Sequence, residues 1–76
     1  MYITVTLQYK DKAFDISLDN RQKLTVGLQT LQDNQKVSYE KEPDFYRSEM
    51  QKRVVSAYRT FADEQIASGD KLTAII

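Results

Sequence analysis

The first twenty residues alternate between apolar and polar side chains in two runs, and this pattern restricts the fold more than any other feature of the chain. Every second residue is apolar in segments 3–7 and 14–18, and residues 10–12 lie between them as a polar turn. A period of two is typical of a half-buried strand, so we predict a β-hairpin with one apolar face. The residues of that face are Ile3, Val5, Leu7, Phe14, Ile16 and Leu18.

An amphipathic helix is predicted directly after the hairpin, where it can cover the apolar face. Its apolar stripe follows the i, i+3, i+4, i+7 spacing of one helix face and consists of Leu24, Gly27, Leu28 and Leu31. Asp19 or Asn20 is predicted to cap this helix, with Gln22 in capping-box spacing from Asp19. Gly27 costs about 1 kcal/mol of helix propensity relative to Ala. We interpret it as a close approach of the helix to the sheet; the alternative is a tolerated weak position.

The helix is expected to end near residues 33–34, after which Val37 returns to the core. Residues 38–44 are predicted to form a loop, because they are mostly polar and Pro43 stops a helix. Residues 68–70 are predicted to form a turn before a last strand. The inward-facing residues of that strand are expected to be Leu72, Ala74 and Ile76.

The stretch between the loop and residue 58 allows two interpretations. At a period of 3.6 its apolar residues form a fair helical stripe that continues to Phe61. At a period of two, Tyr46 and Met50 face inward from a short strand, and residues 53–55 form a shorter one. Periodicity alone favours the helix.

Composition excludes several classes of function. Eleven basic and eleven acidic residues cancel, without the basic stripe that nucleic-acid binding requires. Cysteine and histidine are absent, which removes disulfides, thiolate nucleophiles and the usual group that titrates near neutral pH. No apolar run is long enough for membrane insertion, and the first residues do not form a signal peptide, so we expect a cytoplasmic protein.

No catalytic or ligand-binding motif is evident. Asp11, Asp15 and Asp19 belong to a turn and to outward strand positions, where solvation explains them. The only glycines, Gly27 and Gly69, do not form a phosphate-binding loop, and the acidic residues lack calcium-loop spacing. We therefore predict no catalytic residues, no cofactor, no metal site and no enzymatic activity.

The order of hairpin, helix, loop and final strand resembles the β-grasp fold of ubiquitin. Leu31-Gln32-Asp33 followed by Val37 looks like the helix exit of ubiquitin. The residues that keep ubiquitin's own relative spacing are Pro43-Asp44, Arg47, Arg59-Thr60-Phe61, Asp63 and Ile66. This resemblance favours strands at 45–50 and 53–55, and a short helical turn near 61–64. The implied fold class is α+β, a ubiquitin-like β-grasp domain over residues 1–76. Its mixed sheet would have four to five strands, in the order β-β-α-β-β-β, covered by one helix.

Within this fold the chain is similar to the YukD/EsaB family, ubiquitin-like proteins associated with type VII secretion in Gram-positive bacteria. The similarity lies in the chain length, the start Met1-Tyr2-Ile3 and the ending Phe61-x-Asp63-x-x-Ile66-x-x-Gly69-Asp70-x-Leu72. It implies a non-catalytic protein-interaction module, an accessory or regulatory component that docks on the secretion machinery or on itself.

A covalent modifier or carrier protein is the alternative function. Ubiquitin and the related sulfur carriers end in a flexible Gly-Gly tail, whereas this sequence ends in Ile75-Ile76 within the predicted last strand. A β-branched end held in a sheet does not reach an activating enzyme, so this alternative is disfavoured if the sequence is complete. A domain taken from a longer polypeptide is a third interpretation.

A candidate protein-binding surface follows from the resemblance and from the aromatic residues. Partners of ubiquitin usually grip an apolar patch on the open face of the sheet, where Ile75 is apolar. Glu49 falls at the patch centre, where burial of an unpaired carboxylate would cost several kcal/mol. Aromatic residues among charges are typical of interface anchors. The alternatives are a lone exposed aliphatic residue and a solvated loop whose aromatic side chains fold back on the domain. The candidate surface is Tyr39, Phe45, Arg47, Glu49, Tyr58 and Ile75.

Overall fold

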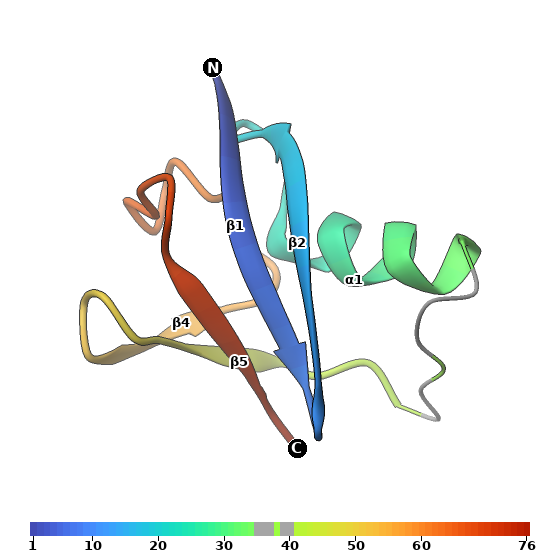
Figure 1. Cartoon of the computed structure of the whole chain (residues 1–76). Helices are drawn as coiled ribbons and strands as arrows, with labels where there is room; N and C mark the ends of the chain where they lie inside the picture. Colours follow the sequence, from blue (N-terminus) through green and yellow to red (C-terminus); the bar gives the residue numbers. More distant parts are fainter. Residues whose placement is uncertain (35–37, 39–40) are drawn as a thin grey trace.

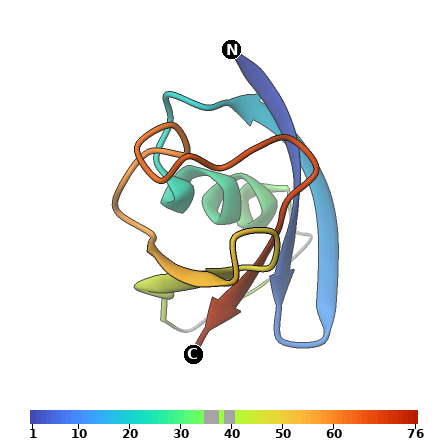
Figure 2. The same ribbon diagram turned by 90° about the vertical axis from the view of Figure 1, so that its left-hand side faces the viewer.

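The computed structural model describes residues 1–34, 38 and 41–76, which form one helix and a sheet of five strands. The sheet curves around the helix, and the chain termini lie at opposite ends of the molecule (Figures 1 and 2). This is the ubiquitin-like β-grasp fold that the sequence resemblance implied.

The predicted hairpin is confirmed. Strands β1 (Tyr2–Tyr9) and β2 (Lys12–Asp19) pair antiparallel along their whole length. Lys10 has a φ of 55° in the two-residue turn, a left-handed conformation that suits tight hairpins. The apolar face is buried on β1, whereas Phe14 and Ile16 of β2 are only partly buried against the core.

The helical stripe is also confirmed, because all four residues of the stripe are buried in α1 (Leu24–Asp33). Gly27 faces the hairpin: a Cβ atom built on it would lie 2.9 Å from Cδ1 of Leu7 and 2.9 Å from Cδ1 of Ile16. The close approach of helix and sheet inferred from Gly27 is therefore correct. The helix ends at Asp33, as expected, and Val37 lies outside the described residues.

The predicted helix cap is wrong. The N-cap residue is Lys23, and it makes no side-chain cap hydrogen bond. The Asp19 carboxylate accepts hydrogen bonds from Arg21 instead. The first helical N–H groups find backbone partners from another part of the chain, since Leu24 donates to the Arg59 carbonyl at 3.1 Å. Tertiary contact thus replaces the local cap.

The ambiguous middle stretch forms strands, as the resemblance to ubiquitin indicated. Strand β3 (Phe45–Ser48) and strand β4 (Arg53–Ser56) are antiparallel, and β3 also pairs antiparallel with β5 (Lys71–Ile75). Strand β5 also pairs with β1, in the parallel direction. These pairings give the sheet order β2-β1-β5-β3-β4. Along the chain, the elements follow the predicted order β-β-α-β-β-β, which is confirmed.

Two details of the C-terminal half differ from the predictions. Met50 is 55% exposed, because β3 ends at Ser48 and Met50 lies in the turn before β4. Ile76 is 67% exposed, because β5 ends one residue earlier. The short helical turn predicted near 61–64 is confirmed, because the Glu64 N–H donates to the Thr60 carbonyl at 3.1 Å and the Gln65 N–H to the Ala62 carbonyl at 3.0 Å.

Candidate functional site

The open face of the sheet, opposite α1, carries an exposed apolar pair. Phe45 of β3 lies directly opposite Ile75 of β5 in the antiparallel ladder. The two side chains are 50% and 44% exposed, although their neighbours Tyr46 and Ala74 are buried on the other face. Strand pairing therefore brings two apolar residues, thirty positions apart in the sequence, into contact distance on the solvent side. We call them the Phe45–Ile75 pair.

A cleft of about 340 Å³ adjoins this pair. It lies between the end of β5, the hairpin turn of β1 and β2, and the segment before β3, because residues of all three line it. Its lining residues are Tyr9, Lys10, Lys41, Glu42, Pro43, Asp44, Phe45, Ile75 and Ile76. A cleft of this size, lined by both apolar and charged residues, suits one bulky side chain of a partner protein.

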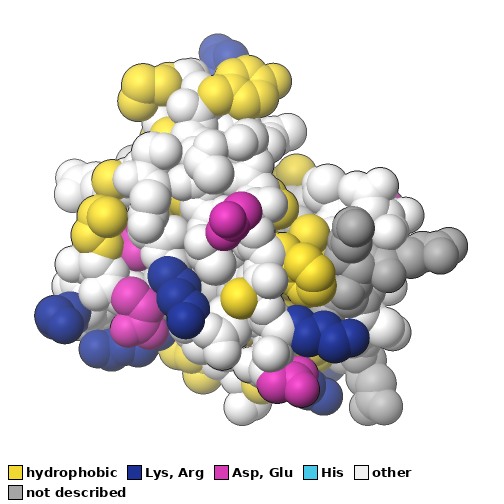
Figure 3. Space-filling view, in the orientation of Figure 1, with side chains coloured by type: hydrophobic (Ala, Val, Ile, Leu, Met, Phe, Trp, Pro, Cys, Tyr) yellow, Lys and Arg dark blue, Asp and Glu magenta, His cyan; other side chains and the backbone are white. Residues whose placement is uncertain are grey.

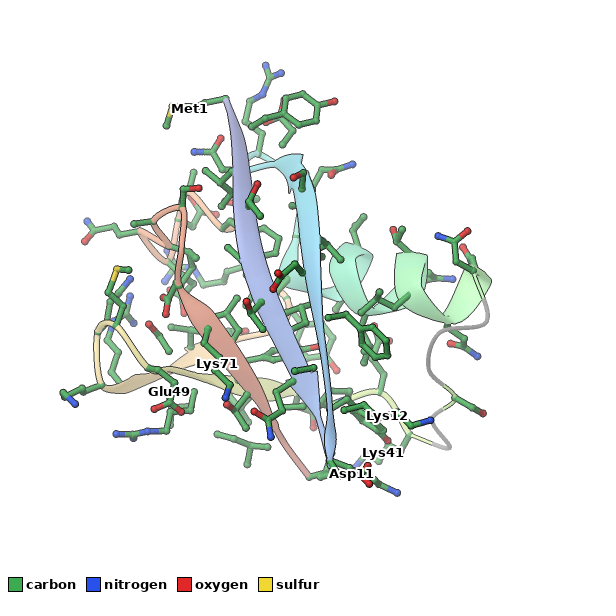
Figure 4. All side chains as sticks on the ribbon, viewed as in Figure 1. Met1, Asp11, Lys12, Lys41, Glu49 and Lys71 are labelled. Atoms are coloured by element: carbon green, nitrogen blue, oxygen red, sulfur yellow. The ribbon has the colours of Figure 1, made fainter. Side chains whose placement is uncertain are left out.

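Charged residues border the pair on the same face. Arg47 is on β3 opposite Thr73, and its Nε lies 3.9 Å from Oε1 of Glu49. The Thr73 hydroxyl donates to Oε2 of Glu49 at 3.4 Å. Figure 4 shows Glu49 and Lys71 close together, and Figure 3 shows apolar side chains on this face in separate groups among charged ones. Arg47 and Thr73 thus separate Glu49 from Ile75.

Tyr58 lies at the border of the site. Its hydroxyl donates to the carboxylate of Asp44, which lines the cleft. This hydrogen bond, with partial burial, raises the pKa of the Tyr58 phenol above its usual value. The Asp44 carbonyl also accepts a hydrogen bond from the Ala57 N–H at 2.9 Å. These two hydrogen bonds hold Asp44, the residue before Phe45, against the residues that follow β4.

A buried polar cluster holds the turn between β3 and β4 in place. Asp70 is 1% exposed and accepts hydrogen bonds from the Ser48 hydroxyl at 2.5 Å and from the Met50 N–H at 3.0 Å. Buried Glu64 accepts from the Ser56 N–H at 2.8 Å and pairs with Arg59 at 3.3 Å. These contacts fix the strands that present the site, and the sequence interpretation did not identify them.

The structure brings together most of the predicted site residues. Phe45, Arg47, Glu49 and Ile75 share the open face, and Tyr58 lies beside Asp44 at its border. Tyr39 lies outside the described residues. The sequence interpretation missed Val54, which is 51% exposed opposite Arg47. It also missed four residues of the cleft lining, which are Tyr9, Lys10, Asp44 and Ile76. Two adjacent valines in β4 hid the alternation that would have identified Val54.

Among the described residues, no three side chains of His, Cys, Asp or Glu gather as a metal site. No helix within those same residues is long and apolar enough to cross a membrane. The described site offers apolar contact, hydrogen bonding and surface charge, which are the elements of macromolecular recognition.

Comparison with known proteins agrees with this architecture. No protein-family model and no curated protein sequence matches the chain. Among solved structures, the ubiquitin-like domain of Arabidopsis thaliana protein At2g32350 is similar, with a TM-score of 0.69 and 12% identity, over 99% of this chain and 77% of that one. The EccD5 ubiquitin-like domain from Mycobacterium xenopi has a TM-score of 0.60 and 13% identity, over 99% of this chain and 93% of that one. The chain therefore has the fold of ubiquitin-like domains.

Proposed function

We propose that this chain is a cytoplasmic, non-catalytic protein-interaction module, one ubiquitin-like domain over residues 1–76. The observation that carries the proposal is the Phe45–Ile75 pair with the cleft beside it. Exposed apolar residues that flank a cleft on a rigid sheet are typical of interface anchors. The partner would insert an apolar side chain into the cleft and lay polar groups against Arg47 and Glu49.

Burial of Phe45 against a partner would contribute a substantial part of the binding free energy. An aromatic side chain buries about 200 Å² when fully covered. The exposed half of Phe45 would therefore add roughly 100 Å² of buried apolar area, which is about 2.5 kcal/mol at about 25 cal/mol per Å². Substitution of Phe45 by Ser should weaken partner binding roughly 50-fold.

We further propose that the partner belongs to a bacterial type VII secretion machinery, in which this module has an accessory or regulatory role. The support is the resemblance of the sequence to the YukD/EsaB family. The presence of the EccD5 domain among the structures with this fold agrees with it.

Site-specific photo-crosslinking in the native host tests both parts. A photoreactive phenylalanine analogue would replace Phe45 in one variant and Gln29, exposed on α1, in a matched control. We expect position 45, and not position 29, to crosslink to a secretion component. An adduct from position 45 to an unrelated protein would support the proposed binding module but contradict its proposed role in secretion. An adduct between two copies would identify self-association. Equal crosslinking from both positions would overturn the site.

A further inference from the structure

Strand β2 lies at one edge of the sheet that the described residues form. Tyr9 and Lys12 close the two-residue turn, so the backbone groups of every second residue from Lys12 onward point toward β1. Those of Ala13, Asp15 and Ser17 point away from the sheet. Within the described residues, no backbone partner is present for the N–H and C=O groups of these three residues.

This edge differs from the one at β4. Strand β2 has eight residues, no proline and an uninterrupted register with β1. Strand β4 has four residues, and its outward Ser56 N–H already donates to Glu64. Natural proteins usually protect long edges by bulges, prolines or covering loops. Strand β2 has neither a bulge nor a proline, and of its charged residues Lys12, Asp15 and Asp19 only Asp15 lies at its centre.

The two faces beside this edge define what can pair with it. On the open face, the Asp15 carboxylate accepts a hydrogen bond from the Thr6 hydroxyl at 2.6 Å, and it makes no ion pair with any described residue. On the helix face, Phe14 and Ile16 are only partly buried. An added strand would therefore meet a carboxylate on one face and unfilled apolar surface on the other.

We propose that β2 docks an extended segment of a partner protein, which adds as a sixth strand and alternates apolar residues with hydroxyl-bearing and basic ones. Its basic residue lies opposite Asp15, and its apolar residues extend the cover over Phe14 and Ile16. The backbone groups of Ala13, Asp15 and Ser17 supply the ladder hydrogen bonds. This site is at the opposite edge of the molecule from β3 and β4, so it is independent of the proposed function.

A second copy of this chain fits the edge less well. Antiparallel pairing of two β2 strands with all three outward residues engaged places Asp15 opposite Asp15 of the other copy. Like charges directly opposite each other destabilise a ladder. A register shifted by two residues avoids this contact but pairs Ala13 with Asp19, whose carbonyl already accepts from Gln22.

The test uses a nine-residue peptide, acetylated and amidated, that alternates threonine and valine and has lysine in place of the central threonine. Hydrogen exchange of the labelled protein is followed by NMR with and without this peptide. We expect slower exchange at the amides of Ala13, Asp15 and Ser17, with no change at Phe14 and Ile16, which already donate to β1. A uniform change, or none, would overturn the proposal.

Two variants make the test specific. Ser17→Pro removes one outward N–H without loss of a bond to β1, so it should abolish peptide binding while the fold remains intact. Asp15→Lys should weaken the lysine peptide and favour a glutamate version, each by up to about fivefold. Unchanged preference in Asp15→Lys would contradict the proposal.

Two further measurements distinguish peptide binding at β2 from binding at the cleft and from self-association. Phe45→Ser should bind the peptide like the wild type; a loss there would place the peptide on the other site and overturn the edge proposal. Concentration-dependent protection of Ala13, Asp15 and Ser17 without peptide would identify a second copy as the occupant and would also overturn it.

Discussion

Substitution of Gly27 tests how closely the helix packs on the hairpin. The Cβ position of residue 27 lies 2.9 Å from the terminal methyl groups of Leu7 and Ile16. Ile16 is partly buried and can move, whereas Leu7 is 1% exposed and tightly surrounded. An alanine therefore requires a small displacement of two side-chain tips, but a leucine requires the helix itself to shift.

The expected free energies follow from two opposing effects. Replacement of Gly by Ala in a helix gains about 1 kcal/mol of propensity, which the displacement of the Leu7 and Ile16 tips offsets. Gly27→Ala should therefore change the free energy of unfolding by less than about 1 kcal/mol. Gly27→Leu should lower it by about 1–3 kcal/mol, because overpacking dominates. That loss is large against roughly 4–11 kcal/mol expected for a chain of 76 residues.

Urea denaturation at 25 °C, followed by circular dichroism, measures these free energies. Gln29→Leu, on the exposed side of α1, is the control and should lie within about 0.5 kcal/mol of the wild type. In a double-mutant cycle, Leu7→Ala should partly relieve Gly27→Leu, because it removes one of the two contacting methyl groups. Wild-type stability of Gly27→Leu, or strict additivity in the cycle, would refute the reasoning.

Two further predictions concern single carboxylates. Asp70→Ala should lower the free energy of unfolding by about 2–3 kcal/mol, because the Ser48 hydroxyl and the Met50 N–H lose their acceptor; urea denaturation without a loss would contradict this. The Arg21 side chain and N–H hold the pKa of Asp19 below its usual value, so its ionised form stabilises the fold above about pH 4 and this contribution is lost as the pH falls further. The melting temperature of Asp19→Asn should therefore be lower than that of the wild type at pH 7, and the two melting temperatures should converge below about pH 4. A difference in melting temperature that does not change with pH would contradict this prediction.

The hairpin and the helix could be predicted because their patterns are local and long. Eight-residue strands show several cycles of a period of two, and the helical stripe covers two turns. Gly27 was informative because glycine has a low helix propensity, so its presence in a buried helical stripe indicates that a side chain would not fit there. The helix cap failed for the opposite reason, since its partners come from residues 57–59, far along the chain.

Strands β3 and β4 could not be predicted from periodicity. Each has only four residues, too few to distinguish a period of two from one of 3.6, and only the resemblance to ubiquitin indicated strands. Phe45 and Ile75 were each predicted as surface residues, but their contact depends on the pairing of β3 with β5. The buried carboxylates of Asp70 and Glu64 give no sequence signal, because charged residues are ordinarily exposed.

Cross-strand nuclear Overhauser effects test the central claim most directly, since the Phe45–Ile75 pair exists only if β3 lies antiparallel beside β5. The Glu49 N–H donates to the Lys71 carbonyl, so Tyr46 and Ala74 form a non-hydrogen-bonded pair, with Cα atoms about 4.5 Å apart in such ladders. We predict a strong Hα–Hα cross-peak between Tyr46 and Ala74. Its absence, together with Hα to amide contacts between residues three apart throughout 44–64, would show a continuous helix and contradict both the fold and the site.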